Sequence, residues 1–93
     1  MTGASDVPSS HELHPVAGAR FVCERIEGPE LGYRVAVYAA GGHTYASELR
    51  WDEAGQASAT PGCADAWVQA ELLKLARVLK HSQQARLTRW RGP

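Results

Sequence analysis

Two segments of alternating side chains flank Gly41-Gly42, and they constrain the fold more than any other part of the chain. Residues 33–40 and residues 43–51 each change character at every second position, which is typical of strands that present one face to a core. Two glycines between such segments favour a tight turn, because glycine readily adopts the left-handed backbone that short hairpin loops require. The pattern therefore predicts an antiparallel hairpin around these glycines.

The length of the hairpin loop decides which side chains share a face. A two-residue loop would pair Val35 with Glu48, and both faces would then mix polar and apolar side chains. A three-residue loop beginning at Ala40 pairs Arg34 with Glu48, an opposite-charge pair worth a few tenths to about 1 kcal/mol. It also places Gly42 where the left-handed residue of such a loop belongs. We therefore predict the three-residue loop.

This register separates an apolar face from a polar one. The face expected to be buried carries Tyr33, Val35, Val37, Tyr45, Leu49 and Trp51. The wetter face carries Arg34, Ala36, Tyr38, Thr44, Ala46, Glu48 and Arg50. A sheet with one apolar face requires a second layer to cover it.

An apolar stripe at helical spacing predicts that second layer over residues 64–81. The centre of the stripe consists of Val68, Leu72, Leu75 and Leu79. Asp65 suits the start of the helix, because a carboxylate there accepts hydrogen bonds from the exposed amides and complements the helix dipole. On or near the opposite side lie Lys74, Arg77 and Lys80.

Two weaker segments complete the predicted sheet. Residues 21–27 are typical of a first strand. The side that it buries is undecided, because Phe21 and Cys23 point one way, whereas Val22 and Ile26 point the other. Residues 56–60 indicate a short fourth strand. We predict an α+β domain in which an antiparallel β-meander of three to four strands packs its apolar face against one long C-terminal amphipathic helix.

The predicted domain spans residues 18–82. Residues 1–17 are small and polar and are expected to form a flexible N-terminal arm. Residues 83–93 lose the apolar stripe and are expected to form a basic C-terminal tail, into which the helix could extend as far as Arg89. A domain of this length buries only a modest apolar core. Such small domains commonly gain extra stability by forming dimers.

Charge is segregated along the chain although its net charge is zero. Residues 66–93 hold six of the 10 basic side chains and one of the 10 acids. This asymmetry indicates either an anionic partner or the acidic half of a second copy. The candidate contact residues in this region are Arg77, Lys80, Arg86, Arg89, Trp90 and Arg91. On the wetter sheet face Arg34, Tyr38 and Arg50 join them, since an exposed aromatic ring flanked by cations can stack on a base.

Catalytic and metal-binding patterns are weak in this sequence. The glycine pairs match neither the P-loop nor the dinucleotide-binding fingerprint. Residues 11–14, His-Glu-Leu-His, have metal-ligand side chains but not the HExxH spacing, and Pro15 disfavours a helix there. We therefore expect no catalytic residues, no metal and no cofactor.

The remaining expectations concern location and partners. The sequence has neither a signal-peptide pattern nor a run of about 20 apolar residues, so no membrane is expected and the cytoplasm is the expected location. Cys23 and Cys63 are then expected to be reduced and to act as small hydrophobes. The prediction is a small soluble non-catalytic interaction module, protein-binding or homodimeric. The alternative is a nucleic-acid-binding protein that uses the basic helix end and tail, although a neutral net charge disfavours strong binding of nucleic acid.

Overall fold

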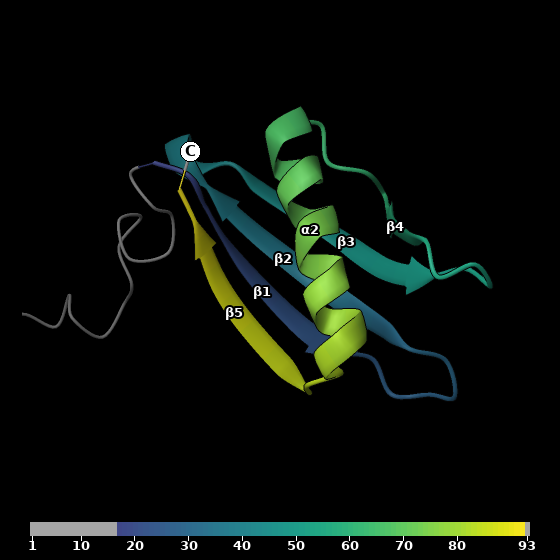
Figure 1. The fold of residues 1–93 in the computed structure, drawn as a ribbon. Coiled ribbons are helices and arrows are strands. Elements are labelled where there is room, and N and C mark those ends of the chain that lie inside the picture. The colour runs from purple at the N-terminus through teal and green to yellow at the C-terminus, as the bar shows by residue number, and fades with distance from the viewer. Residues whose placement is uncertain (1–16, 93) are drawn as a thin grey trace, which may run out of the picture.

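The computed structural model describes residues 17–92. Its elements in chain order are β1 (Ala19–Arg25), β2 (Gly32–Ala39), a 3₁₀ turn (Ala40–Gly42), β3 (Thr44–Trp51), β4 (Ala57–Thr60), α2 (Ala66–Ser82) and β5 (Arg86–Arg91). The five strands form one antiparallel sheet in the order β4-β3-β2-β1-β5, and α2 lies across one side of it (Figure 1). The α+β fold is confirmed, with five strands instead of three or four. The expected N-terminal arm, apart from Ala17, and the His-Glu-Leu-His segment lie outside the described residues.

The hairpin between β2 and β3 has the predicted register. Arg34 lies opposite Glu48. The amide of Ala39 donates to the carbonyl of His43 across 2.8 Å and closes the three-residue loop. Gly42 has the expected left-handed backbone, with φ of 79°, and the preceding glycine shares it, with φ of 81°. The charge pair and the loop chemistry thus predicted the pairing correctly.

The core lies between α2 and the apolar face of the sheet. Val35, Val37 and Tyr33 are fully buried there, whereas Tyr45 and Trp51 are only half-buried. The central helix positions Val68, Leu72, Leu75 and Leu79 are all buried, as predicted. The structure also settles the orientation of the first strand, which buries Ala19, Phe21 and Cys23.

Both ends of α2 have identifiable caps. The Asp65 carboxylate accepts a hydrogen bond from the Val68 amide across 3.1 Å, as expected for an N-cap. At the other end Gln83 adopts a left-handed conformation, with φ of 51°, and its amide donates to the Leu79 carbonyl across 2.7 Å. This C-cap ends the helix at Ser82, before the basic segment begins.

The residues expected to form a basic tail are an edge strand of the sheet, so the helix does not extend to Arg89. β5 pairs antiparallel with β1 and places Leu87, which is 9 % exposed, opposite Cys23. α2 therefore carries the chain from the β4 edge of the sheet to the opposite edge (Figure 1). The physical reason is the alternation of β5, in which Leu87 enters the core and its polar neighbours stay outside.

The side of the sheet away from α2, here called the open face, is covered by no other element within residues 17–92 (Figure 1). The register places on it Arg20, Val22, Glu24, Arg34, Ala36, Tyr38, Thr44, Ala46, Glu48, Arg50, Ser58, Thr60, Arg86, Thr88 and Trp90. Across the described part of the chain, no helix has the length and apolar character needed to cross a membrane.

Candidate interaction surface

Opposite charges alternate across four strands of the open face. Arg86 on β5 lies opposite Glu24 on β1, which lies opposite Arg34 on β2, which lies opposite Glu48 on β3. We call these four residues the charged row. Each neighbouring pair is a cross-strand pair of opposite sign, the arrangement that stabilises antiparallel sheets.

A second row on the open face carries two aromatic side chains. Trp90 on β5 lies opposite Arg20 on β1, and Arg20 lies opposite Tyr38 on β2. We call these three residues the aromatic row. Trp90 is 59 % exposed. Arg20 and Tyr38 are half-buried.

Between these two rows the open face carries mostly short side chains. Thr88, Val22, Ala36 and Ala46 lie opposite one another across four strands. We call them the small row. Short side chains at the centre of a sheet face allow another backbone or sheet to approach closely, at the roughly 10 Å separation of packed sheets.

Arg50 lies at one end of the open face. Its Nε donates to a Glu48 carboxylate oxygen across 2.7 Å. Its guanidinium group lies directly over Gly32, where a Cβ would be 2.5 Å from Nη1. Gly32 therefore gives the arginine room to lie flat on the sheet, and any larger residue would displace it.

The structure separates the basic residues that the sequence grouped together. Arg86 and Trp90 lie on the open face, with the predicted Arg34, Tyr38 and Arg50. Arg89 and Arg91 alternate with them and lie on the helix side of the sheet, where Arg91 Nε is 4.0 Å from a carboxylate oxygen of Glu71. Arg77 and Lys80 lie elsewhere, on α2 beside the turn between β3 and β4.

Sequence reasoning missed the β1 part of the open face. Arg20, Val22 and Glu24 supply the centre of all three rows, but they were not among the candidate residues. The signal that could have found them is the alternation of Phe21 and Cys23, which bury on the helix side and so place their neighbours outward.

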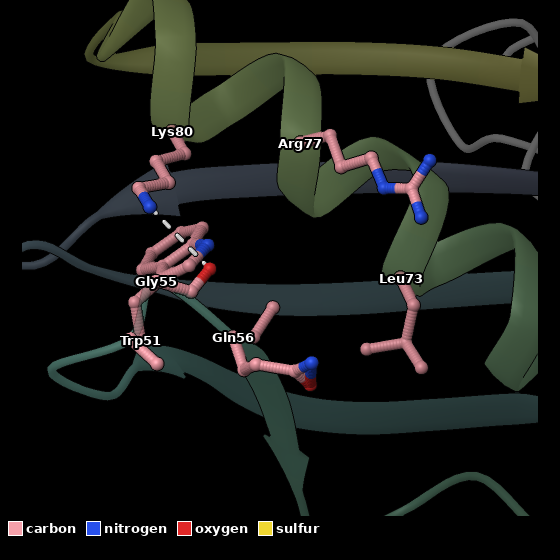
Figure 2. A pocket seen from close by; sticks show the side chains of 8 residues that line it. Trp51, Gly55, Gln56, Leu73, Arg77 and Lys80 are labelled. Carbon is pink, nitrogen blue, oxygen red and sulfur yellow. Dashed lines mark hydrogen bonds between the residues drawn. The ribbon is translucent and has the colours of Figure 1, made fainter.

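A separate hollow of about 340 Å³ lies between α2 and the β3–β4 turn (Figure 2). We call it the helix-side hollow. The residues that line it are Trp51, Ala54, Gly55, Gln56, Ala57, Leu73, Arg77 and Lys80. The Lys80 ammonium group donates to the Gly55 carbonyl across 3.3 Å, which Figure 2 shows as a dashed line.

The two cysteines and Ser47 lie in the core or at its margin. Burial raises the pKa of the Cys23 thiol to about 11, so the thiol stays protonated near neutral pH. The Ser47 hydroxyl donates to the Pro61 carbonyl across 2.6 Å and lies 3.8 Å from the sulfur of Cys63. Within residues 17–92 no three His, Cys, Asp or Glu side chains gather in a way that could hold a metal ion.

Comparison with protein-family models, with curated proteins and with solved structures finds no match to this chain.

Proposed function

We propose that this chain is a non-catalytic interaction module that forms a homodimer through the open face of its sheet. The observation that carries the proposal is the charged row, whose signs alternate from one end to the other. Such a row is complementary to a second copy of itself when that copy is turned end for end. The cytoplasm is the proposed location, which fits two cysteines that are both free thiols.

The charged row selects one orientation for the dimer. A two-fold axis parallel to the strands, between β1 and β2, would place Glu24 over Arg34 of the second copy. The same axis would place Arg86 over Glu48 of the second copy. A two-fold axis at right angles to the strands and along the charged row would instead place each charge over the same residue of the second copy, which is unfavourable.

The other two rows fit the same axis. Val22 would lie over Ala36 of the second copy, so that short side chains meet at the centre of the interface. Arg20 would lie over the Tyr38 ring of the second copy, a contact that cation–π attraction favours. Because sheets twist, residues far from the axis are carried out of alignment with their partners in the second copy. The three pairs between β1 and β2, which lie nearest the axis, therefore contribute most to the interface.

The dimer is tested by placing a charge at the centre of the small row. Val22→Arg would put two cations at the axis, and we expect it to sediment as a monomer at concentrations where the native chain is a dimer. Val78→Arg is the matched control, because Val78 is exposed on α2 and far from the open face. A native chain that is monomeric at high micromolar concentration would overturn the proposal, as would equal behaviour of the two variants.

Charge exchange tests the orientation. Glu24→Arg or Arg34→Glu alone creates like-charge pairs and should weaken the dimer by about tenfold or more. The double variant restores opposite charges between copies and between positions 24 and 34 within a copy, although position 24 then has the charge sign of Arg86 and position 34 that of Glu48. It should therefore dimerise more tightly than either single variant. A double variant that is folded by circular dichroism but dimerises no better than the single variants would exclude the axis parallel to the strands.

Binding of single-stranded nucleic acid is the second candidate function, and the aromatic row favours it. An exposed tryptophan beside an arginine and a tyrosine can stack on successive bases. Arg89 and Arg91, on the other side of β5, would then contribute only to the surrounding field. This function requires affinity for a mixed oligonucleotide that falls steeply with salt and is lost in Trp90→Ala. An affinity that depends on neither salt nor the Trp90→Ala substitution would exclude this function.

A further inference from the structure

We propose that the helix-side hollow binds a small carboxylate with an apolar, single-ring body. The hollow lies on the α2 side of the sheet, so this site is independent of the proposed dimer on the open face. Its volume, about 340 Å³, is near the lower end of the range typical of small-molecule sites. The ligand is therefore limited to roughly the size of one substituted ring.

The apolar walls of the hollow are supplied by three elements. Trp51 comes from the end of β3, Ala57 from the start of β4 and Leu73 from α2. The Trp51 ring makes an edge-to-face contact with Tyr33, at 6.1 Å between centroids and 79° between planes. Because Tyr33 is fully buried and donates to the Gln84 carbonyl across 2.7 Å, it holds the indole in place. A fixed indole wall favours an aromatic ligand.

The polar rim of the hollow carries two cations and no acid. Arg77 and Lys80 lie three positions apart on α2 and so share one side of the helix. In Figure 2 the Lys80 side chain points from α2 to Gly55, and the Arg77 side chain extends along α2 toward Leu73. Within residues 17–92 the Arg77 side chain has neither a hydrogen bond nor an ion pair. An arginine without a counter-charge beside an apolar wall is suited to a carboxylate, which its planar group binds through two parallel hydrogen bonds.

The β3–β4 turn is shaped to hold the second cation. Gly55 has a positive φ of 84°, and a Cβ at this position would collide with the Lys80 ammonium group. Glycine therefore allows Lys80 to reach the Gly55 carbonyl and to remain at the rim. The turn and the helix together fix one positive group, while Arg77 remains available for the ligand.

Acidic residues on the far side of Trp51 restrict where an anion can enter. Glu30, Asp52 and Glu53 line a neighbouring hollow that shares Trp51 and Ala54 with the first. Their charges repel a carboxylate on that side, so the anionic group must face α2 and the ring must lie against Trp51.

The site is tested by ¹⁵N NMR titration with phenylacetate, phenylacetamide and acetate. We expect phenylacetate to shift the indole N–H of Trp51 and the amides of Gly55 and Arg77. Phenylacetamide lacks the charge and acetate lacks the ring, so each should bind at least about tenfold more weakly. Equal shifts from all three probes, or shifts spread over the whole surface, would overturn the proposal.

Two variants of α2 separate a specific site from general charge attraction. Arg77→Gln removes the unpaired cation and should weaken phenylacetate binding by about tenfold. Lys74→Gln removes one equal charge from the same helix, but Lys74 pairs with Glu71 across 2.8 Å and does not line the hollow. It should therefore bind phenylacetate like the native chain. Equal losses in the two variants would reject the site.

A third variant keeps this proposal distinguishable from the proposed dimer. Val22→Arg disrupts the open face and leaves the helix-side hollow unchanged. It should bind phenylacetate with native affinity whether or not the native chain dimerises. Loss of binding in this variant would show that the hollow is not an independent site.

Discussion

At the scale of single residues, burial determines the chemistry of the two cysteines. Cys23 is fully buried in β1, and removal from water raises the pKa of its thiol to about 11 from an ordinary 9.0. Cys63 is half-buried, and its sulfur lies 3.8 Å from the Ser47 hydroxyl oxygen. Cys23 therefore behaves as a small apolar side chain and not as a nucleophile, as its position in the core requires.

The Cys23 thiol should make the free energy of unfolding depend on pH in alkaline solution. The unfolded thiol loses its proton first, so stability is complete below pH 9.0 and falls as the pH approaches about 11. The fall should be about 2–3 kcal/mol. Denaturant unfolding across this range measures it. Cys23→Ala should reduce the slope but leave the part due to Tyr33, whose pKa burial also raises. If Cys23→Ala left the pH dependence of the free energy of unfolding unchanged, its assignment to the Cys23 thiol would be contradicted.

At the scale of elements, the predicted and the unpredicted parts differ in how much apolar pattern they carry. The β2–β3 hairpin and α2 each place several large apolar side chains at one regular spacing, and the sequence predicted both. β5 buries only Leu87, and Arg89 and Arg91 share its side, so its alternation was hidden. Arginine is tolerated at these two positions because, on an edge strand, its long aliphatic stem can carry the guanidinium group to solvent.

The open face was only partly predictable for the same reason. Its residues on β2 and β3 followed from the hairpin register, which the charges of Arg34 and Glu48 determined. The open-face residues on β1 and β5 could be found only by knowing which strands are neighbours in the sheet. No local sequence pattern indicates that β5 pairs with β1. Only the tertiary pairing places Trp90 in line with Arg20 and Tyr38.

β5 should contribute to stability as a strand and not as a tail. Leu87→Ala removes a buried side chain and should lower the free energy of unfolding by about 2 kcal/mol or more. Arg89→Gln changes an exposed side chain of the same strand and should change it by less than about 0.5 kcal/mol. Denaturant unfolding of the two variants makes the comparison. Equal small effects would mean that this segment is not paired with β1 in solution.

The N-cap of α2 should contribute measurably to stability. Asp65→Ala leaves the Val68 amide without its acceptor and should cost about 0.5–2 kcal/mol. Asp65→Asn keeps a side-chain oxygen in the same place and should recover most of this loss. Thermal unfolding of both variants provides the measurement, and an unaffected Asp65→Ala would show that the helix begins elsewhere.

At the scale of the whole molecule, the sheet is covered on one side and open on the other. α2 covers the apolar side, and the side that remains open carries the three rows of complementary side chains. Charge is thus organised across the fold more than along the chain, because β5 places Arg86 opposite Glu24, the acid of β1. The balanced net charge of the sequence hides this arrangement.

Dimerisation through the open face should make thermal stability depend on protein concentration. Above the dissociation constant, the melting temperature should rise by about 3–5 °C for each tenfold increase in concentration. High salt should lower the melting temperature of the dimer, because it screens the charged row. The Val22→Arg variant should have the same melting temperature at every protein concentration. A native melting temperature that is constant with concentration would argue for a monomer.

The pairing of β5 with β1 has a consequence for the order of folding. The β2–β3 hairpin joins neighbours in the sequence, whereas Cys23 and Leu87 come from opposite ends of the described chain. Closing so long a loop costs entropy that the other contacts must first offset. The sheet is therefore expected to grow outward from its hairpin and to close at β5 last, so that weakening Leu87 speeds unfolding and leaves the folding rate almost unchanged.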